Sequence, residues 1–100
     1  MKALLIDPAQ QTITDAEVED ATDIQRLIGF DTIESDAVGA TGDRLYFDEE
    51  CFIRGTTGRF QFDTVIPVAG KGVIVGTDAD GNLRDVQTTA EELRGRIKFQ

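Results

Sequence analysis

Turn signals recur at short intervals along this chain of 100 residues and leave no room for a long helix between consecutive strands. Asp7-Pro8 suits a type I turn, and the stretch "DADGN" from Asp78 to Asn82 suits a hairpin turn. Parallel strands need a crossover of roughly a dozen or more residues, which is usually helical. We therefore expect one α+β domain over residues 1–100, built on a small, mainly antiparallel sheet of hairpins with two short helices.

Short apolar and β-branched runs predict six to eight strands between these turns. The segment "DRLYFDEECFIRG", residues 43–55, is expected to be a hairpin with Asp48-Glu49-Glu50 at its tip. The expected strands are residues 2–6, 12–18, 30–36, 44–47, 52–54, 60–62, 71–77 and 83–86.

Two capping boxes predict where the helices begin. Thr22 and Gln25 suit the start of a first helix, which Gly29 would end. Thr89 and Glu92 suit the start of a second helix. Its apolar stripe would include Leu93 and Ile97, although Gly95 weakens the helical pattern. Both helices are expected to be short.

The net charge of −9 is concentrated in the first half of the chain. Residues 1–50 carry 13 acids and three bases, whereas residues 51–100 carry six acids and seven bases. Direct nucleic-acid binding needs clustered Lys and Arg, so we do not expect it. A basic protein partner suits this charge better, and solubility alone would also explain it.

The composition offers little for catalysis, metal binding or membrane insertion. There is no histidine, so neither a Cys-His pair nor a Ser-His triad can form. Three acids precede Cys51, the one cysteine, and would oppose a thiolate, so a structural role is favoured over a nucleophile. We expect no catalytic residue, metal or cofactor, no membrane association, and a cytoplasmic location.

The stretch "GKGVIVG", from Gly70 to Gly76, resembles a phosphate-binding loop only superficially. Its glycine spacing is wrong for the dinucleotide fingerprint, and no helix is expected to follow it. Glycines flanking a buried strand explain it better.

A belt of acids is the most distinctive functional signal. If two adjoining strands and the first helix carried it, it would form a dense negative surface, which could imitate a DNA backbone; a solvated surface is the plain alternative. The residues expected to form a protein-binding face are Glu17, Glu19, Asp20 and Asp23. The belt is Asp15, Glu17, Glu19, Asp20, Asp23, Asp31, Glu34 and Asp36, with Arg26 as the one base among them.

A second candidate is an aromatic and basic patch formed by Arg44, Tyr46, Phe52 and Arg54 on the expected hairpin. It could bind a small ligand, or it could be the partly exposed face of a thin sheet.

The order of four segments resembles a family of small domains of unknown function found in bacteria, plasmids and phages. The segments are "KALLIDPAQQTIT", "DIQRLIGF" followed by "TIE", "LYFDEECFIRG", and "IPVAGKGVIVGTDADGNLRDV" before a final helix. The resemblance implies an intracellular α+β domain, often in mobile-element surroundings, and implies no catalytic residues. One departure is at the hairpin tip, where Cys51 replaces the family's glycine. Either Cys51 adopts the left-handed backbone that a glycine would favour, at a cost of roughly 1 kcal/mol, or the tip has a different conformation.

Together these features favour a non-enzymatic interaction module whose acidic face binds a basic or DNA-binding protein. An anti-restriction DNA mimic is a special case. The alternative is a small-ligand domain centred on Tyr46 and Arg54. Exposed edge strands leave both monomer and homodimer open.

Overall fold

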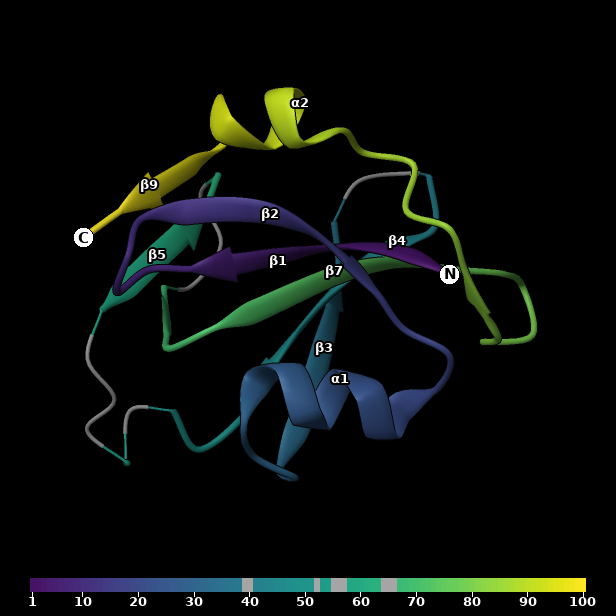
Figure 1. Cartoon of the computed structure of the whole chain (residues 1–100), viewed down its shortest axis with the longest axis horizontal. Coiled ribbons are helices and arrows are strands. Elements are labelled where there is room, and N and C mark those ends of the chain that lie inside the picture. The colour runs from purple at the N-terminus through teal and green to yellow at the C-terminus, as the bar shows by residue number, and fades with distance from the viewer. Residues whose placement is uncertain (39–40, 52, 55–57, 64–66) are drawn as a thin grey trace.

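The computed structural model describes residues 1–38, 41–51, 53–54, 58–63 and 67–100, and confirms the predicted α+β class with antiparallel sheets and two helices. Figure 1 shows α1 below the larger sheet, with α2 and the smaller sheet on the opposite side. The elements are β1 (Lys2–Asp7), β2 (Thr12–Glu17), α1 (Ala21–Ile28), β3 (Ile33–Ala37), β4 (Asp43–Asp48), β5 (Arg59–Phe62), β6 (Val68–Ala69), β7 (Gly72–Thr77), β8 (Leu83–Arg84), α2 (Ala90–Arg94) and β9 (Ile97–Phe99).

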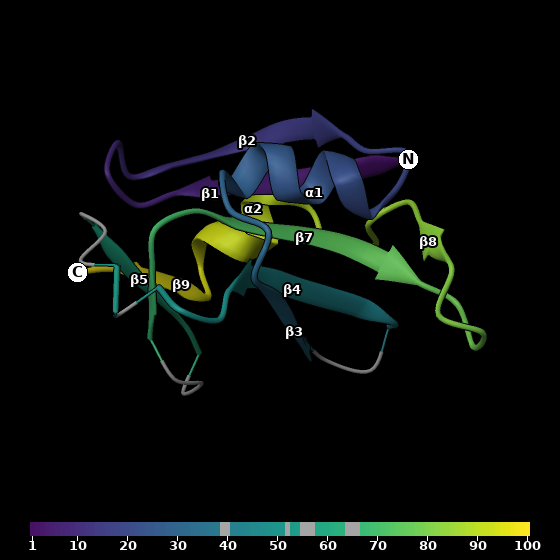
Figure 2. The same ribbon diagram turned by 90° about the horizontal axis from the view of Figure 1, so that it is seen from below.

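The larger sheet has the strand order β2-β1-β7-β4-β3, with β8 paired to the end of β7. The smaller sheet has the order β6-β5-β9. Every strand pair among the described residues is antiparallel, as the short connections predict. Figure 2 shows β2 and β3 at opposite edges of the larger sheet.

Two hydrophobic clusters lie on the two faces of the larger sheet, and β7 contributes to both. Val73 and Val75 pack with Ile24 in the cluster under α1. Ile74 points the other way and packs with Phe60 in the cluster that the smaller sheet and α2 cover. Successive strand residues point to opposite faces, so a continuous apolar run such as that of β7 is buried on both sides.

The cap of the first helix is Asp20, two residues before the predicted Thr22 cap. Asp20 has an extended backbone, and its carboxylate accepts hydrogen bonds from the Thr22 and Asp23 amides at 3.0 and 3.3 Å. A carboxylate is as good a cap as a hydroxyl and also suits the positive end of the helix dipole. Gly29 ends the helix in the left-handed region at φ 94°, as predicted.

The second helix begins at the predicted cap but ends earlier than expected. The Thr89 hydroxyl accepts a hydrogen bond from the Glu92 amide at 3.1 Å. The helix stops at Arg94, and Ile97 lies in β9, where it pairs with Phe62 rather than extending a helical stripe. Within the part of the chain that the structure describes, neither helix is long and apolar enough to span a membrane.

The predicted hairpin over residues 43–55 is wrong. Strand β4 pairs with β3 and β7. The chain after β4 folds into a turn in which the Ile53 and Arg54 amides both donate to the Glu50 carbonyl, at 3.0 and 3.1 Å. Phe52, expected in the return strand, lies outside the described residues. Cys51 is not among the residues with positive φ, so it does not need the conformation that a glycine would favour.

Candidate functional site

The four proposed protein-binding acids occupy one corner of the molecule, where β2 passes into α1. We call Glu17, Glu19, Asp20 and Asp23 the acidic corner. Glu17 ends β2, Glu19 and Asp20 form the link, and Asp23 lies in the first turn of α1. These four residues lie close together because they all belong to one short segment, residues 17–23.

Half of the acidic corner also maintains the local structure. Asp20 caps α1, and the Asp23 carboxylate accepts a hydrogen bond from the Glu19 amide at 2.8 Å and pairs with Arg26 at 3.1 Å. The bond from the Glu19 amide, followed by that from Arg26, lowers the pKa of the Asp23 carboxyl. Glu17 and Glu19 are exposed, and neither forms an ion pair with a described residue. These two carboxylates are therefore the ones available to a partner.

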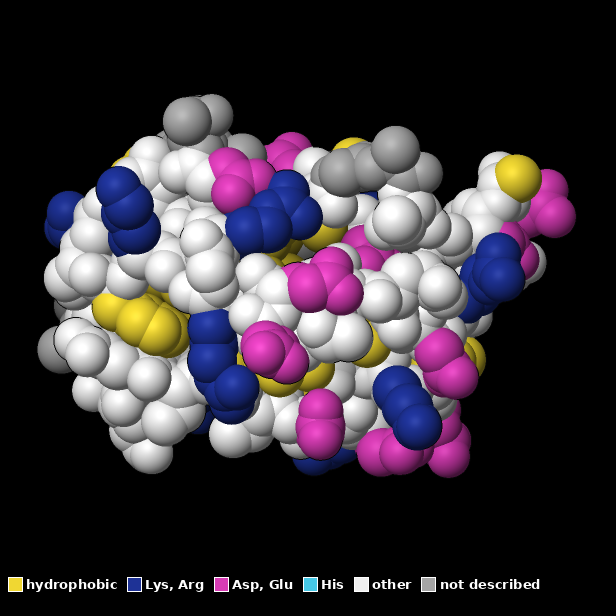
Figure 3. Space-filling model, turned by 90° about the horizontal axis from the view of Figure 1, so that it is seen from above, with side chains coloured by type: hydrophobic (Ala, Val, Ile, Leu, Met, Phe, Trp, Pro, Cys, Tyr) yellow, Lys and Arg dark blue, Asp and Glu magenta, His cyan; other side chains and the backbone are white. Residues whose placement is uncertain are grey.

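The wider acidic belt does not form one surface. Asp15 and Glu17 lie on β2, whereas Glu34 and Asp36 lie on β3, and the sheet order puts three strands between them. The expectation that adjoining strands carry the acids is therefore wrong, because the pairing of β1 with β7 separates the two. Figure 3, which looks at the side that carries α2, shows acidic and basic side chains interspersed.

Arg44 and Tyr46 of the proposed aromatic and basic patch lie on the α1 side of β4. The Arg44 guanidinium donates to the hydroxyl and the carbonyl oxygen of Ser35 on β3, both at 3.0 Å. Tyr46 is half-buried against the cluster that contains Val73. Burial raises the pKa of the Tyr46 phenol, and the nearby Arg44 charge opposes that rise.

Arg54 belongs to a different polar cluster at the end of β4. Its guanidinium donates to Asp48 at 2.6 Å and to the Thr32 hydroxyl at 2.9 Å, and it lies 4.1 Å from the centre of the Phe30 ring. It also lies 3.6 Å from the Glu50 carboxylate. The contacts of Arg54 are therefore separate from those of Arg44.

The Asp48 carboxylate is the centre of that cluster. Its side chain is 3% exposed and accepts hydrogen bonds from the Thr32 hydroxyl, the Glu50 amide and Arg54. Burial alone would raise the pKa of Asp48, but these hydrogen bonds and the Arg54 charge outweigh it, so the pKa lies below its ordinary value. Asp48 thus remains ionised and fully engaged, which makes it a structural anion.

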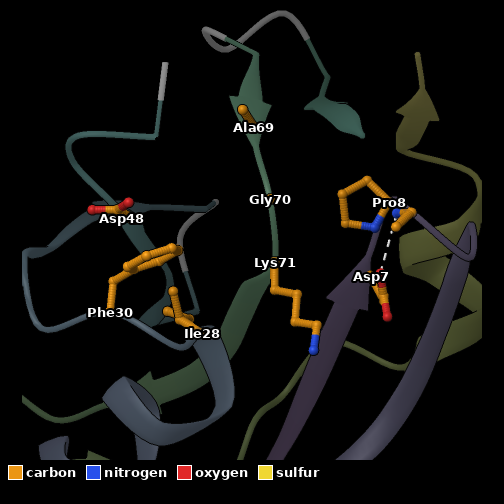
Figure 4. A pocket seen from close by; sticks show the side chains of 9 residues that line it. Asp7, Pro8, Ile28, Phe30, Asp48, Ala69, Gly70 and Lys71 are labelled. Atoms are coloured by element: carbon orange, nitrogen blue, oxygen red, sulfur yellow. Dashed lines mark hydrogen bonds between the residues drawn. The ribbon is translucent and has the colours of Figure 1, made fainter. Parts of the chain in front are cut away.

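A cleft of about 310 Å³ opens beside this cluster and was not foreseen from the sequence. Figure 4 shows Phe30, Ile28 and Asp48 on one side, Pro8 on the other, and Gly70 and Lys71 between them. Among the described residues Lys71 has no ion-pair partner. The lining of the cleft comes from segments that are separate in the sequence, and the sequence signals within them include the turn at Asp7-Pro8 and the glycine-flanked stretch that begins at Gly70.

The remaining motifs have structural explanations. Cys51 is a free thiol, 4% exposed, within the cluster that contains Leu45. The "GKGVIVG" stretch contains all but the last residue of the buried strand β7. A Cβ atom at Gly72 would lie 2.7 Å from Cζ of Phe60, which explains that glycine by packing. Within the described residues, no group of three or more Cys, Asp or Glu side chains is arranged to hold a metal ion.

Comparisons with protein-family models, with curated proteins and with solved structures find no match to this chain.

Proposed function

We propose that this protein is a non-enzymatic interaction module that binds a basic protein through its acidic corner. The observation that carries the proposal is the pair of exposed carboxylates at Glu17 and Glu19, neither of which forms an ion pair with a described residue. Asp20 and Asp23 contribute charge beside them while fixing the start of α1. A partner would therefore meet negative charge on a preorganised backbone, which reduces the entropy lost on binding.

Neutralising the two available acids tests this function without removing the helix cap. Immobilised wild-type protein and the Glu17→Gln, Glu19→Gln double variant would be exposed to the same cell lysate, and the captured proteins quantified by mass spectrometry. We expect the double variant to lose basic partners. The matched control is Glu34→Gln with Asp36→Asn, which removes the same charge from the opposite edge. Equal capture by wild type and both variants would refute the proposal.

The DNA-mimic, anti-restriction version is a narrower form of this proposal. The high negative charge supports it, as does the resemblance to domains from plasmids and phages. It also agrees with action in the cytoplasm, where a lone cysteine stays reduced. It predicts that duplex DNA displaces the captured partner, because DNA and the acidic corner would compete for one basic site. Partner capture that is insensitive to excess duplex DNA would exclude this version.

Small-ligand binding is a second candidate, and the cleft favours it over the Tyr46 patch. At about 310 Å³ the cleft is near the lower end of ligand-pocket volumes. The Phe30 ring offers an apolar wall, and Lys71 offers an ammonium that forms no ion pair with a described residue. A thermal-shift panel of small carboxylic acids on wild type and Lys71→Gln tests it, since a bound ligand would raise Tm only in wild type.

A further inference from the structure

The hydrogen-bond register of β2 determines which of its main-chain groups face outward. The Met1 amino group donates to the Val18 carbonyl oxygen at 2.6 Å, and the Val18 amide donates to the Met1 carbonyl oxygen at 3.0 Å. Hydrogen-bonded and non-bonded pairs alternate along an antiparallel ladder. Ala16 and Thr14 therefore bond to β1, whereas the N–H and C=O groups of Asp15 and Glu17 point away from it.

These outward groups lie on an open edge. Strand β2 is the terminal strand of its sheet, and Figure 2 shows it outermost with no other segment beyond it. Within the described part of the chain, no main-chain hydrogen bond joins the outward N–H and C=O groups of Asp15 and Glu17 to another segment. An edge of this kind is a template for one more strand.

The side chains of the same two residues face a groove of about 450 Å³ between β2 and the segment that leads into α2. Leu4, Val86 and Ala90 contribute apolar surface to it, and Lys2 contributes one ammonium against the two carboxylates. The groove suits the alkyl stem and charged head of a lysine or arginine side chain, because such residues pack their stems on apolar surface while the charge stays at the rim.

The opposite edge lacks this combination. On β3 the Val38 amide bonds to the Asp43 carbonyl and the Glu49 amide to the Thr32 carbonyl, so alternation turns the main chain of Ser35 outward. The Ser35 carbonyl oxygen already accepts from Arg44. The β3 acids, Glu34 and Asp36, belong to residues that bond inward to β4. Of these two edge strands, β2 alone has residues that combine outward-facing main-chain groups with acidic side chains.

We propose that β2 binds its partner by strand addition, taking an extended segment with basic residues at positions i and i+2. In antiparallel addition, Asp15 and Glu17 each exchange two main-chain hydrogen bonds with one partner residue, whose side chain lies on the same face. The basic side chains then lie beside the two carboxylates and enter the groove. This inference rests on the proposed function and specifies the partner and its binding mode.

Peptides with selectively methylated backbone nitrogens test the binding mode. The probe is acetyl-Val-Lys-Val-Lys-Val-amide, titrated into the labelled protein and followed by NMR. Methylating both lysine nitrogens removes donors that face β2. Methylating the second and third valine nitrogens, which face away, is the matched control. We expect the first change to weaken binding about tenfold or more and the second to change it by less than about twofold.

Hydrogen exchange and charge variants provide independent readouts. The bound peptide is expected to slow amide exchange at Asp15 and Glu17. The Asp15→Asn, Glu17→Gln double variant should weaken binding about tenfold, whereas Glu34→Gln with Asp36→Asn should leave it unchanged.

The outcomes separate this inference from the proposed function. If the acidic corner captures basic proteins but the peptide fails to bind, or if both methylated peptides bind equally, strand addition is wrong and the function stands. If neither basic proteins nor the peptide bind, both are wrong. Peptide binding that depends on the lysine nitrogens supports both.

Discussion

The Asp43 carboxylate accepts hydrogen bonds from both the amide and the hydroxyl of Thr88, at 2.8 and 2.7 Å. A third bond comes from the Gln87 amide at 3.0 Å. Asp43 is fully buried at the start of β4, and Thr88 directly precedes the cap of α2. One carboxylate therefore fastens the segment before α2 to the larger sheet.

Removing that carboxylate should destabilise the protein. Asp43→Ala leaves the buried amide and hydroxyl of Thr88, and the partly buried Gln87 amide, without their acceptor, so we expect the free energy of unfolding to fall by about 2–4 kcal/mol. Urea unfolding followed by circular dichroism measures it. Thr88→Val, which removes only one donor, should cost less than Asp43→Ala. A loss below about 0.5 kcal/mol for Asp43→Ala would contradict this role.

The Asp48 and Arg54 pair predicts a pH dependence of stability. The pKa of Asp48 is lower in the folded protein than in the unfolded chain, so its contribution is complete above the unfolded pKa of about 3.9. It is lost as the pH falls through the folded pKa. The stability difference between wild type and Asp48→Asn should be constant above about pH 5 and shrink below about pH 4. If the stability difference between wild type and Asp48→Asn stays constant down to pH 2, the ionised Asp48 carboxylate does not contribute as described.

The helix cap distinguishes structural from available acids within the acidic corner. Asp20→Ala removes the acceptor for the Thr22 and Asp23 amides and should cost about 1 kcal/mol. Glu19→Ala is the matched control, because the Glu19 side chain makes no ion pair with a described residue, and should change stability by less than about 0.5 kcal/mol. Chemical unfolding of both variants measures the two losses in the free energy of unfolding. Equal losses would show that Asp20 is not the cap.

Two glycines should respond in opposite ways to the same substitution. A Cβ at Gly72 would lie 2.7 Å from Phe60 and 3.0 Å from Leu45, so Gly72→Ala should cost about 1–3 kcal/mol. At Gly95 the nearest atom would be the Glu92 carbonyl oxygen at 3.5 Å, and φ is −77°. Gly95→Ala should therefore be neutral or stabilise by about 0.5 kcal/mol. Thermal unfolding compares the stabilities of the two variants. If Gly95→Ala is destabilised, a Cβ atom at position 95 does not fit without a clash.

Several turns and helix caps of this fold were predictable from local sequence signals, whereas the pairing of distant strands was not. The DADGN turn and the caps at Gly29 and Thr89 act within a few residues, so the sequence reveals them directly. The partner of β4 depends on which distant strand buries Leu45, and no turn signal encodes that choice. The composition of residues 52–54 predicts a strand, whereas in the structure Arg54 lies in a turn, where its guanidinium bonds to the buried Asp48.

The same contrast between local and long-range features holds for the candidate site. The acidic corner was predictable because its four residues are consecutive or nearly so. The division of the acidic belt between two edges was not, because it follows from the insertion of β7 between β1 and β4. The cleft beside Phe30 escaped prediction for a similar reason, since its lining comes from segments far apart in the sequence.

The position of β7 also has a consequence for unfolding. Its alternate residues belong to both hydrophobic clusters, so neither the α1 layer nor the smaller sheet has a core that excludes this strand. Losing β7 from either side exposes apolar surface on the other. The two layers should therefore melt together in one cooperative transition, with the calorimetric and van't Hoff enthalpies equal.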